Sequence, residues 1–153
     1  MKLDTLLAGR HLLADLSANE IEFLESVASE VHFARGDVLF EEDAVADTFY
    51  ILQEGTVGLQ LTTPGEPPMV IQTLGSGDLL GVSWALPPYR WSWQATAVTD
   101  TALIAFDAEK VRQRCEVDGR LAHQILRLVA REAIRRLNAA RTQLLDLYHT
   151  GDR

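Results

Sequence analysis

The spacing of apolar side chains changes twice along this chain of 153 residues. Over residues 1–32 the apolar positions recur at helical intervals, which predicts short helices. Ser17 and Glu20 stand three residues apart, as in a capping box, so one helix is expected to begin after Ser17. Over residues 33–106 the interval falls to two and glycines separate the runs, which predicts short strands joined by tight turns.

The strand candidates are short and evenly spaced, an arrangement typical of an antiparallel sandwich or jelly roll. Apolar and polar residues alternate most clearly between Val57 and Leu61, as expected for a half-buried strand. The candidates are Val38–Phe40, Phe49–Leu52, Val57–Leu61, Val70–Ile71 and Ala102–Phe106.

The third zone returns to helical spacing, with a short helix expected within 107–119 and a long one over 120–148. The long helix contains no Gly or Pro and would measure roughly 40 Å. One of its apolar stripes repeats at intervals of four and three for about three heptads, as a coiled-coil seam does. This predicted dimer seam comprises Leu126, Ala130, Ala133, Leu137, Ala140, Leu144 and Leu147.

A second apolar stripe of the long helix, formed by Ile125, Val129 and Ile134, lies beside the seam. Two stripes require two partners. We therefore expect the second stripe to cover the β zone and the seam to form a parallel homodimer. A helix that lies wholly on its own sheet is the alternative.

The net charge of −8 is distributed unevenly. Residues 1–100 carry 4 basic and 15 acidic side chains, whereas residues 101–153 carry 10 basic and 7 acidic ones. The acidic body disfavours general affinity for nucleic acid, because phosphate contacts depend on Lys and Arg. No apolar stretch approaches the roughly 20 residues of a membrane span, and no signal-peptide core follows Met1. A cytoplasmic protein without membrane contact is expected.

The residue types give little support to metal or catalytic chemistry. Cys115 is the single cysteine, and the four histidines have no metal-ligand spacing, so neither a metal nor another cofactor is expected. Catalysis in cupins, which have a related jelly roll, needs a cluster of histidines, but His32 is the only one near the β zone. We therefore expect the protein not to be an enzyme.

The order of helices, glycine-punctuated β-roll and long amphipathic helix resembles the cyclic nucleotide-binding domain of the catabolite activator protein (Crp/Fnr) family. Gly36–Glu42 resembles the opening hairpin, Phe49–Val57 the aromatic strand, and Leu74–Gly81 the approach to the phosphate-binding cassette. Asp43 stands where the family usually has a turn glycine, and Asp tolerates the left-handed backbone such a turn needs. The resemblance implies one mainly β domain over 1–153: a double-stranded β-helix (jelly roll) with N-terminal helices and a C-terminal dimerisation helix.

The resemblance also implies a ligand site at a cassette that begins at Gly81. In the family, backbone N–H groups after this glycine receive the cyclic phosphate, a neighbouring Glu binds the ribose hydroxyl, and a later Arg pairs with the phosphate. Here Val82 stands at the position of the Glu and Trp91-Ser92 at that of Arg-Ser, with Arg90 one residue earlier. Because each lost charge-assisted contact costs roughly 1.5–3 kcal/mol, an ordinary cyclic AMP site is not expected. Arg90 is either a displaced anion ligand or a surface residue.

Aromatic residues crowd the segment 83–93, which holds all three tryptophans. They form a pocket for another small ligand, nucleotide-like or not, a surface for a protein partner, or a filling for the space of the nucleotide. Arg135 or Arg136 of the long helix either closes over the site or lies on a solvated face. By resemblance, the ligand-binding candidates are Gly81, Val82, Ser83, Trp84, Arg90, Trp91 and Ser92, of which Trp84 and Trp91 are expected to line the pocket.

The sequence therefore predicts a non-catalytic regulatory or sensor module with a degenerate cassette. We expect a homodimer that signals through its C-terminal helix to an output protein. One alternative is a Crp/Fnr-type transcriptional regulator seen without its DNA-binding domain, because residues 149–153 stand where the family's hinge would begin. Direct DNA binding by this chain is not expected, since no recognition helix is present. The other alternative is a protein-interaction module that binds no small ligand.

Overall fold

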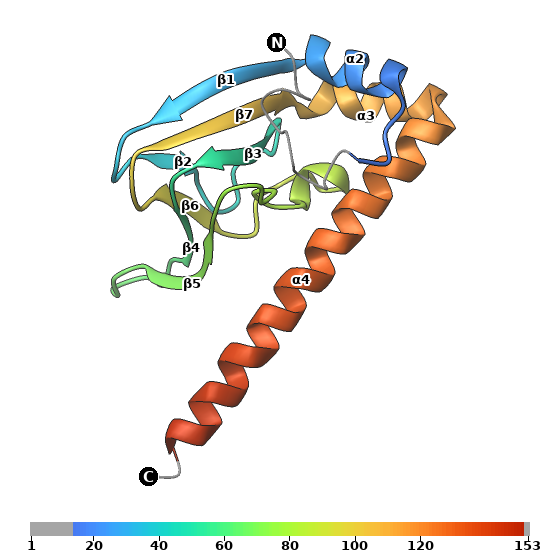
Figure 1. Cartoon of the computed structure of the whole chain (residues 1–153). Helices are drawn as coiled ribbons and strands as arrows, with labels where there is room; N and C mark the ends of the chain where they lie inside the picture. Colours follow the sequence, from blue (N-terminus) through green and yellow to red (C-terminus); the bar gives the residue numbers. More distant parts are fainter. Residues whose placement is uncertain (1–13, 152–153) are drawn as a thin grey trace.

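The computed structural model describes residues 14–151, which form a β-roll flanked by helices (Figure 1). One sheet has the strand order β1-β7-β3 and the other has the order β2-β6-β4-β5, and every strand pairing is antiparallel. This jelly-roll architecture confirms the predicted fold class. In chain order the elements are α2 (Ala18–Ser26), β1 (Ala28–Phe33), β2 (Val38–Phe40), β3 (Thr48–Glu54), β4 (Val57–Leu61), β5 (Met69–Leu74), the 3₁₀ turn η2 (Ser83–Ala85), β6 (Gln94–Ala97), β7 (Thr101–Asp107), α3 (Ala108–Val117) and α4 (Gly119–Gly151).

The N-terminal zone differs in part from the prediction. The capping box of α2 is present: the Ser17 Oγ accepts from the Glu20 N–H, and the Ser17 N–H donates to the Glu20 carboxylate. The helix ends at Ser26, however, and Ala28–Phe33 is strand β1 rather than the end of the predicted helices. Strand β1 pairs with β7 along its whole length, and these long-range hydrogen bonds outweigh the local helical spacing. Residues 1–13 of this zone lie outside the described residues.

All the strand candidates lie in observed strands, but the sequence missed β6. This strand consists of Gln94–Ala97, in which two buried alanines alternate with half-buried polar residues, and four residues with side chains this small give only a weak hydrophobic signal. It lies between β2 and β4 and pairs with both. Its place in the sheet therefore follows from hydrogen bonding on two sides, which local pattern does not reveal.

Two turns show why the backbone restricts the residue type. Asp43 has a φ of 67°, which confirms the left-handed conformation expected of it. Gly55 has a φ of 94°, and a Cβ atom there would lie 2.4 Å from the Asp100 carbonyl oxygen. Only glycine can occupy the second turn without moving the backbone.

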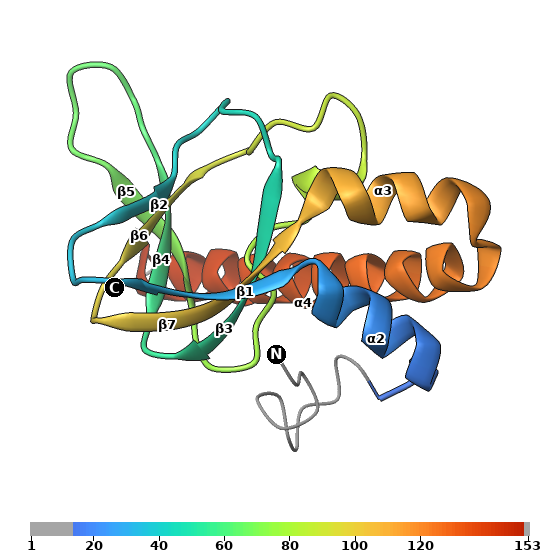
Figure 2. The same cartoon turned by 90° about the horizontal axis from the view of Figure 1, so that it is seen from above.

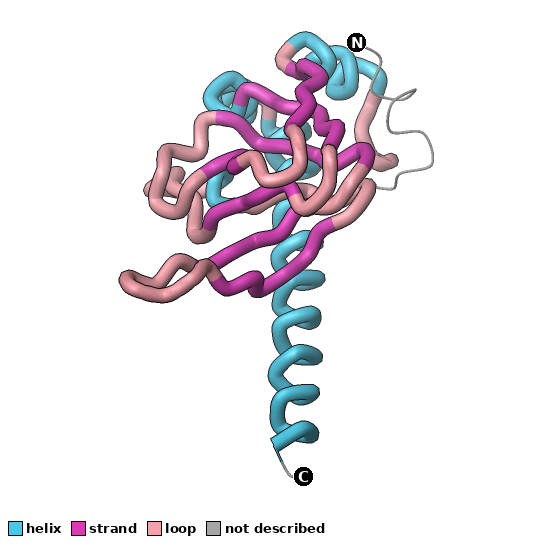
Figure 3. The backbone as a smooth tube through the Cα atoms, turned by 90° about the vertical axis from the view of Figure 1, so that its left-hand side faces the viewer, coloured by secondary structure: helices cyan, strands magenta, loops and turns pink. Residues whose placement is uncertain are grey.

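Helix α4 begins after Asp118, whose Oδ1 accepts a hydrogen bond from the Leu121 N–H at 3.1 Å. It runs to Gly151, beyond the predicted end at residue 148. Its first turns pack antiparallel to α3 (Figure 2), and its last turns project beyond the strands (Figure 3). No helix within residues 14–151 is both long enough and apolar enough to cross a membrane.

The two apolar stripes of α4 meet different surroundings. Ile125 and Val129 are buried in the core as expected, whereas Ile134 is 58% exposed, so that part of the prediction is wrong. The buried face of α4 instead continues through two charged residues, Glu132 and Arg136. All positions of the predicted dimer seam are exposed: Leu126, Ala130, Ala133, Leu137, Ala140, Leu144 and Leu147.

Candidate functional site

The cassette begins at Gly81, whose backbone has a φ of 86°. A Cβ atom at this position would lie 2.5 Å from Cζ3 of Trp91, so the indole ring rests directly against the glycine. The ring of Trp91 is 4% exposed and stacks on Phe40, with the ring centres 3.9 Å apart. Trp91, which the resemblance places at the position of the family's arginine, thus packs directly against the glycine at which the cassette is expected to begin.

Trp84 is the second buried tryptophan of the predicted cassette. Its ring is fully buried and stacks on Phe49 at 3.8 Å between centres. The indole N–H donates to the Gly81 carbonyl oxygen at 3.0 Å, which satisfies its single donor within the loop. Both tryptophans therefore belong to the hydrophobic core.

The remaining cassette candidates bind one another or neighbouring turns. Val82 is half-buried and carries no polar group toward a ligand. The hydroxyls of Ser83 and Ser92 lie 3.1 Å apart and join the two ends of the loop. Arg90 is exposed and donates from Nη1 to the Asp43 carbonyl oxygen at 2.8 Å, across the left-handed turn. The structure thus brings the two serines together, whereas the hydrogen bond of Arg90 joins it to another loop.

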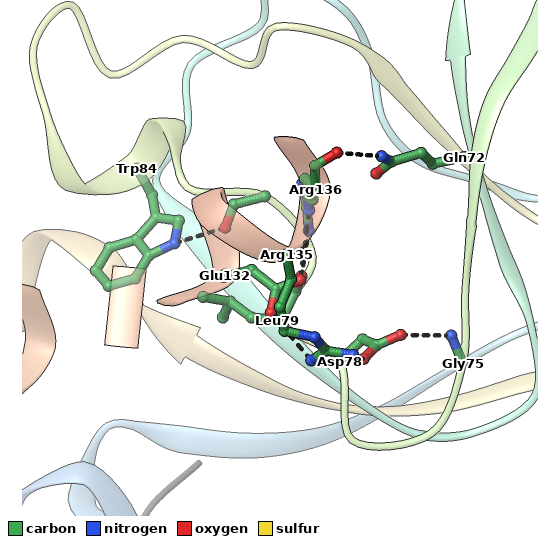
Figure 4. A network of polar contacts seen from close by, with 9 residues as sticks. Gln72, Gly75, Asp78, Leu79, Trp84, Glu132, Arg135 and Arg136 are labelled. Carbon is green, nitrogen blue, oxygen red and sulfur yellow. Dashed lines mark hydrogen bonds and ion pairs between the residues drawn. The ribbon is translucent and has the colours of Figure 1, made fainter. Parts of the chain in front are cut away.

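Helix α4 contributes a cluster of charges beside the approach to the cassette (Figure 4). Arg136 is 8% exposed; its Nη2 donates to the Leu79 carbonyl oxygen, and its Nε lies 3.4 Å from Oε1 of Glu132. Arg135 is 58% exposed and donates to Asp78 Oδ1 at 3.2 Å. Of the two adjacent arginines, only Arg136 reaches the protein interior.

The same cluster is tied to two further segments. The Gln72 side chain of β5 donates to the Arg136 carbonyl oxygen at 3.0 Å. The other oxygen of Asp78 accepts from the Gly75 N–H at 2.9 Å and closes the turn before the cassette. Strand β5, the turn and helix α4 are therefore held in one hydrogen-bonded network.

Burial sets the electrostatics of this cluster. It raises the pKa of the Glu132 carboxyl, and the neighbouring Arg136 and Arg135 counter this only in part. Burial likewise lowers the pKa of the Arg136 guanidinium, against the opposing effect of Glu132. The Nη1 atom of Arg136 is buried and has no hydrogen-bond partner within residues 14–151.

Sequence reasoning named both arginines but missed Glu132 and Asp78. A signal was present, because Glu132 and Arg136 continue the helical spacing of the buried residues Ile125 and Val129. Charged residues on a buried stripe are expected to pair. Within the part of the chain that the structure describes, no group of His, Cys, Asp or Glu side chains is arranged to hold a metal ion.

Residues 30–118 match the profile of a known family, the cyclic nucleotide-binding domain. A "CRP-like cAMP-activated global transcriptional regulator" of Mycobacterium tuberculosis is 25% identical over 148 residues, covering 97% of this chain and 64% of the regulator. The nitrogen fixation regulation protein FixK of Bradyrhizobium diazoefficiens is 26% identical over 132 residues, covering 86% of this chain and 53% of that protein. The chain thus spans less than two thirds of the length of these relatives.

Solved structures show the same fold. A putative cyclic nucleotide-binding protein from Geobacter metallireducens GS-15 superposes with a TM-score of 0.81 at 23% identity, covering 90% of this chain and 98% of that one. The N-terminal domain of a transcriptional regulator from Streptomyces coelicolor A3(2) superposes with a TM-score of 0.67 at 31% identity. That alignment covers 88% of this chain and 94% of the other.

Proposed function

We propose that this chain, which belongs to the family of cyclic nucleotide-binding domains, is a non-catalytic regulatory module that does not depend on a cyclic nucleotide. It is related to Crp-like transcriptional regulators. In our proposal the side chains of the protein itself link the cassette to helix α4, and they take the place of a link through a bound nucleotide. The module acts as a homodimer and passes its signal through α4 to an output protein.

The packing of Trp91 against Gly81 is the observation that carries this proposal. A phosphate that approached the glycine would first have to displace a ring that is 4% exposed and stacked in the core. The two positions from which the resemblance would supply a cation do not offset that cost, because Trp91 itself stands at the arginine position and Arg90 binds the Asp43 turn. Val82 also offers no acceptor for a ribose hydroxyl.

The charge cluster supports the second half of the proposal. Arg136 binds the carbonyl oxygen of Leu79, two residues before the cassette glycine, and Arg135 pairs with Asp78 beside it. Both arginines belong to α4, so the helix is attached to the cassette approach without a ligand. A movement of either part would have to break a buried charge-assisted hydrogen bond.

Titration with cyclic nucleotides tests the cassette. We expect no saturable heat by isothermal titration calorimetry with cyclic AMP or cyclic GMP up to about 1 mM. The regulator of M. tuberculosis, described as cAMP-activated, serves as the positive control. Saturable binding of either nucleotide below about 10 μM would refute the proposal, since it would require the cassette to open and bind phosphate without an arginine.

The exposed seam of α4 supports the homodimer. Leu126, Leu137 and Leu144 are 55%, 64% and 57% exposed in the single chain, at coiled-coil spacing. Light scattering after size-exclusion chromatography should give a mass of about 34 kDa, twice that of the 17.0 kDa chain. Leu137→Glu should yield the monomer, because it places unpaired charge in the seam.

The matched control for this variant is Asn138→Glu. Asn138 is exposed on the same helical turn but lies outside the seam. The Asn138→Glu substitution adds the same charge to α4 but leaves that charge in solvent, so the dimer should persist. A wild-type monomer at tens of micromolar, or equal dissociation in the two variants, would contradict a dimer built on this seam.

A further inference from the structure

Trp84, which stacks on Phe49, also lines a cavity. This pocket of about 240 Å³ is formed by the loop of residues 84–89, helix α3 and the first turns of α4. Its walls are mainly apolar and comprise Trp84, Ala85, Val111, Ala122, Ile125 and Leu126. The volume suits a molecule smaller than most drug-sized ligands.

One cation stands in this apolar wall. Arg112 is half-buried; its Nη1 donates to the carbonyl oxygens of Ala46 at 3.2 Å and Trp84 at 2.8 Å. The guanidinium carbon lies 4.2 Å from the centre of the Tyr89 ring, which also lines the pocket. These contacts position the guanidinium, but each partner is a neutral group.

The charge of Arg112 is not paired with a carboxylate in the part of the chain that the structure describes. Among residues 14–151 it forms no ion pair within 4.0 Å, although Glu116 lines the same pocket one helical turn away. Glu116 is exposed, so solvent and salt screen its charge. A partly desolvated cation beside apolar walls is an environment in which an anion with an apolar body is bound favourably.

Two other pockets of comparable size do not have this character. A pocket of about 180 Å³ beside α4 contains two arginines, but Asp78 and Glu132 already pair with them. A larger one between β1 and α3 is lined by three carboxylates and one lysine. Neither leaves a cation without a carboxylate partner.

We propose that the pocket behind Trp84 binds a small carboxylic acid with an apolar body, in its carboxylate form. The body contacts the apolar walls, and the carboxylate takes the guanidinium donors of Arg112 that the two carbonyl groups leave free. A bound acid would touch Trp84, which holds the cassette glycine, and Leu126, which begins the exposed seam of α4. The site is separate from the charge cluster at Arg136 and goes beyond the proposed function.

Titration of the full chain with phenylacetate and octanoate tests this site, with phenylethanol and octanol as neutral controls. We expect the acids to bind with a Kd of about 0.1–1 mM and the alcohols at least about tenfold more weakly. Arg112→Gln should remove this preference for the acid. Ala122→Leu should abolish binding of both classes, because it fills the pocket from α4 and leaves Arg112 in place.

Arg127→Gln is the matched control, since it removes an exposed positive charge of α4 outside this pocket and should leave acid binding unchanged. Circular dichroism establishes that each variant is folded before titration. No binding of either acid at about 10 mM, or equal affinity for acid and alcohol, would overturn the proposal. Undiminished acid binding in Ala122→Leu would also overturn it, by placing the acid elsewhere. Each of these outcomes is independent of the cyclic nucleotide titration.

Discussion

Removing the buried guanidinium of Arg136 should destabilise the protein far more than removing its exposed neighbour. In Arg136→Met, the Leu79 carbonyl oxygen loses a charge-assisted hydrogen bond, and Glu132 keeps only Arg135, at 3.5 Å, as its cationic partner. Breaking a buried ion pair by removing one partner costs about 3–5 kcal/mol. The lower end of this range of free energies applies to Arg136→Met, because Arg135 remains and because burial already raises the pKa of Glu132, which favours its protonated form.

We therefore expect the free energy of unfolding to fall by about 3 kcal/mol in Arg136→Met. For a chain of this size that corresponds to a fall in Tm of about 6–12 °C. Urea denaturation followed by tryptophan fluorescence measures the change, at fixed protein concentration because dimerisation would add to the apparent stability. The Trp84 and Trp91 rings, both buried, report the loss of the core.

Arg135→Met is the internal control. This residue is 58% exposed and its ion pairs are solvated, so its loss should cost less than about 1 kcal/mol. The double variant Glu132→Gln/Arg136→Met should recover at least about 1 kcal/mol relative to Arg136→Met, because neither position then carries a buried charge. Equal losses in the two arginine variants, or no recovery in the double variant, would refute a buried, paired Arg136.

Three other changes have defined outcomes. Gly81→Ala should destabilise the protein by more than about 3 kcal/mol, because Gly81 has a φ of 86° and its Cα lies against the Trp91 ring. In a Trp91→Leu background the same change should cost only about 1–2 kcal/mol, as a double-mutant cycle measured by denaturation would show. Equal costs in the two backgrounds would contradict the contact. The folded-state pKa of Glu132 is raised, so the stability that this group contributes is present below the unfolded-state pKa of a glutamate and is lost as pH rises through the folded-state pKa. Wild-type should therefore gain stability relative to Glu132→Gln as the pH falls from neutral toward the ordinary pKa of a glutamate. A flat difference would argue against a raised pKa. Asp43→Gly should stabilise the protein by about 0.5–1 kcal/mol in thermal denaturation, since glycine adopts a φ of 67° without strain. A lower Tm would mean that the contacts of the Asp side chain stabilise the protein by more than the strained backbone destabilises it.

Features that depend on neighbours in the chain were predictable. The capping box joins Ser17 to Glu20 over three residues, and its hydrogen bonds form as the spacing indicated. The left-handed turn at Asp43 follows from the conformational range of that residue type. Strand β1 was not predictable in this way, because its pairing partner β7 begins about 70 residues later.

The cassette shows the same division at the level of single side chains. The sequence identified Val82 and Trp91 as departures from the family pattern, and that is a matter of residue identity alone. It could not decide between an aromatic pocket and an aromatic filling, because both use the same residues. The structure places both rings in the hydrophobic core, where Trp91 stacks on Phe40 and Trp84 on Phe49, and each pair brings together distant segments.

The sequence by itself determined the jelly roll, the turns and the long helix, and its resemblance to the family predicted the loss of the acidic and basic cassette residues. Tertiary structure alone decided that Arg136 lies in the interior while Arg135 lies at the surface. It also decided that Arg112, which forms no ion pair among residues 14–151, stands in a mainly apolar wall. Local structure follows from short-range sterics and hydrogen bonds, which the order of residues specifies. Burial and charge pairing depend instead on which face of a helix meets the roll, and that is set by the packing of all the elements together.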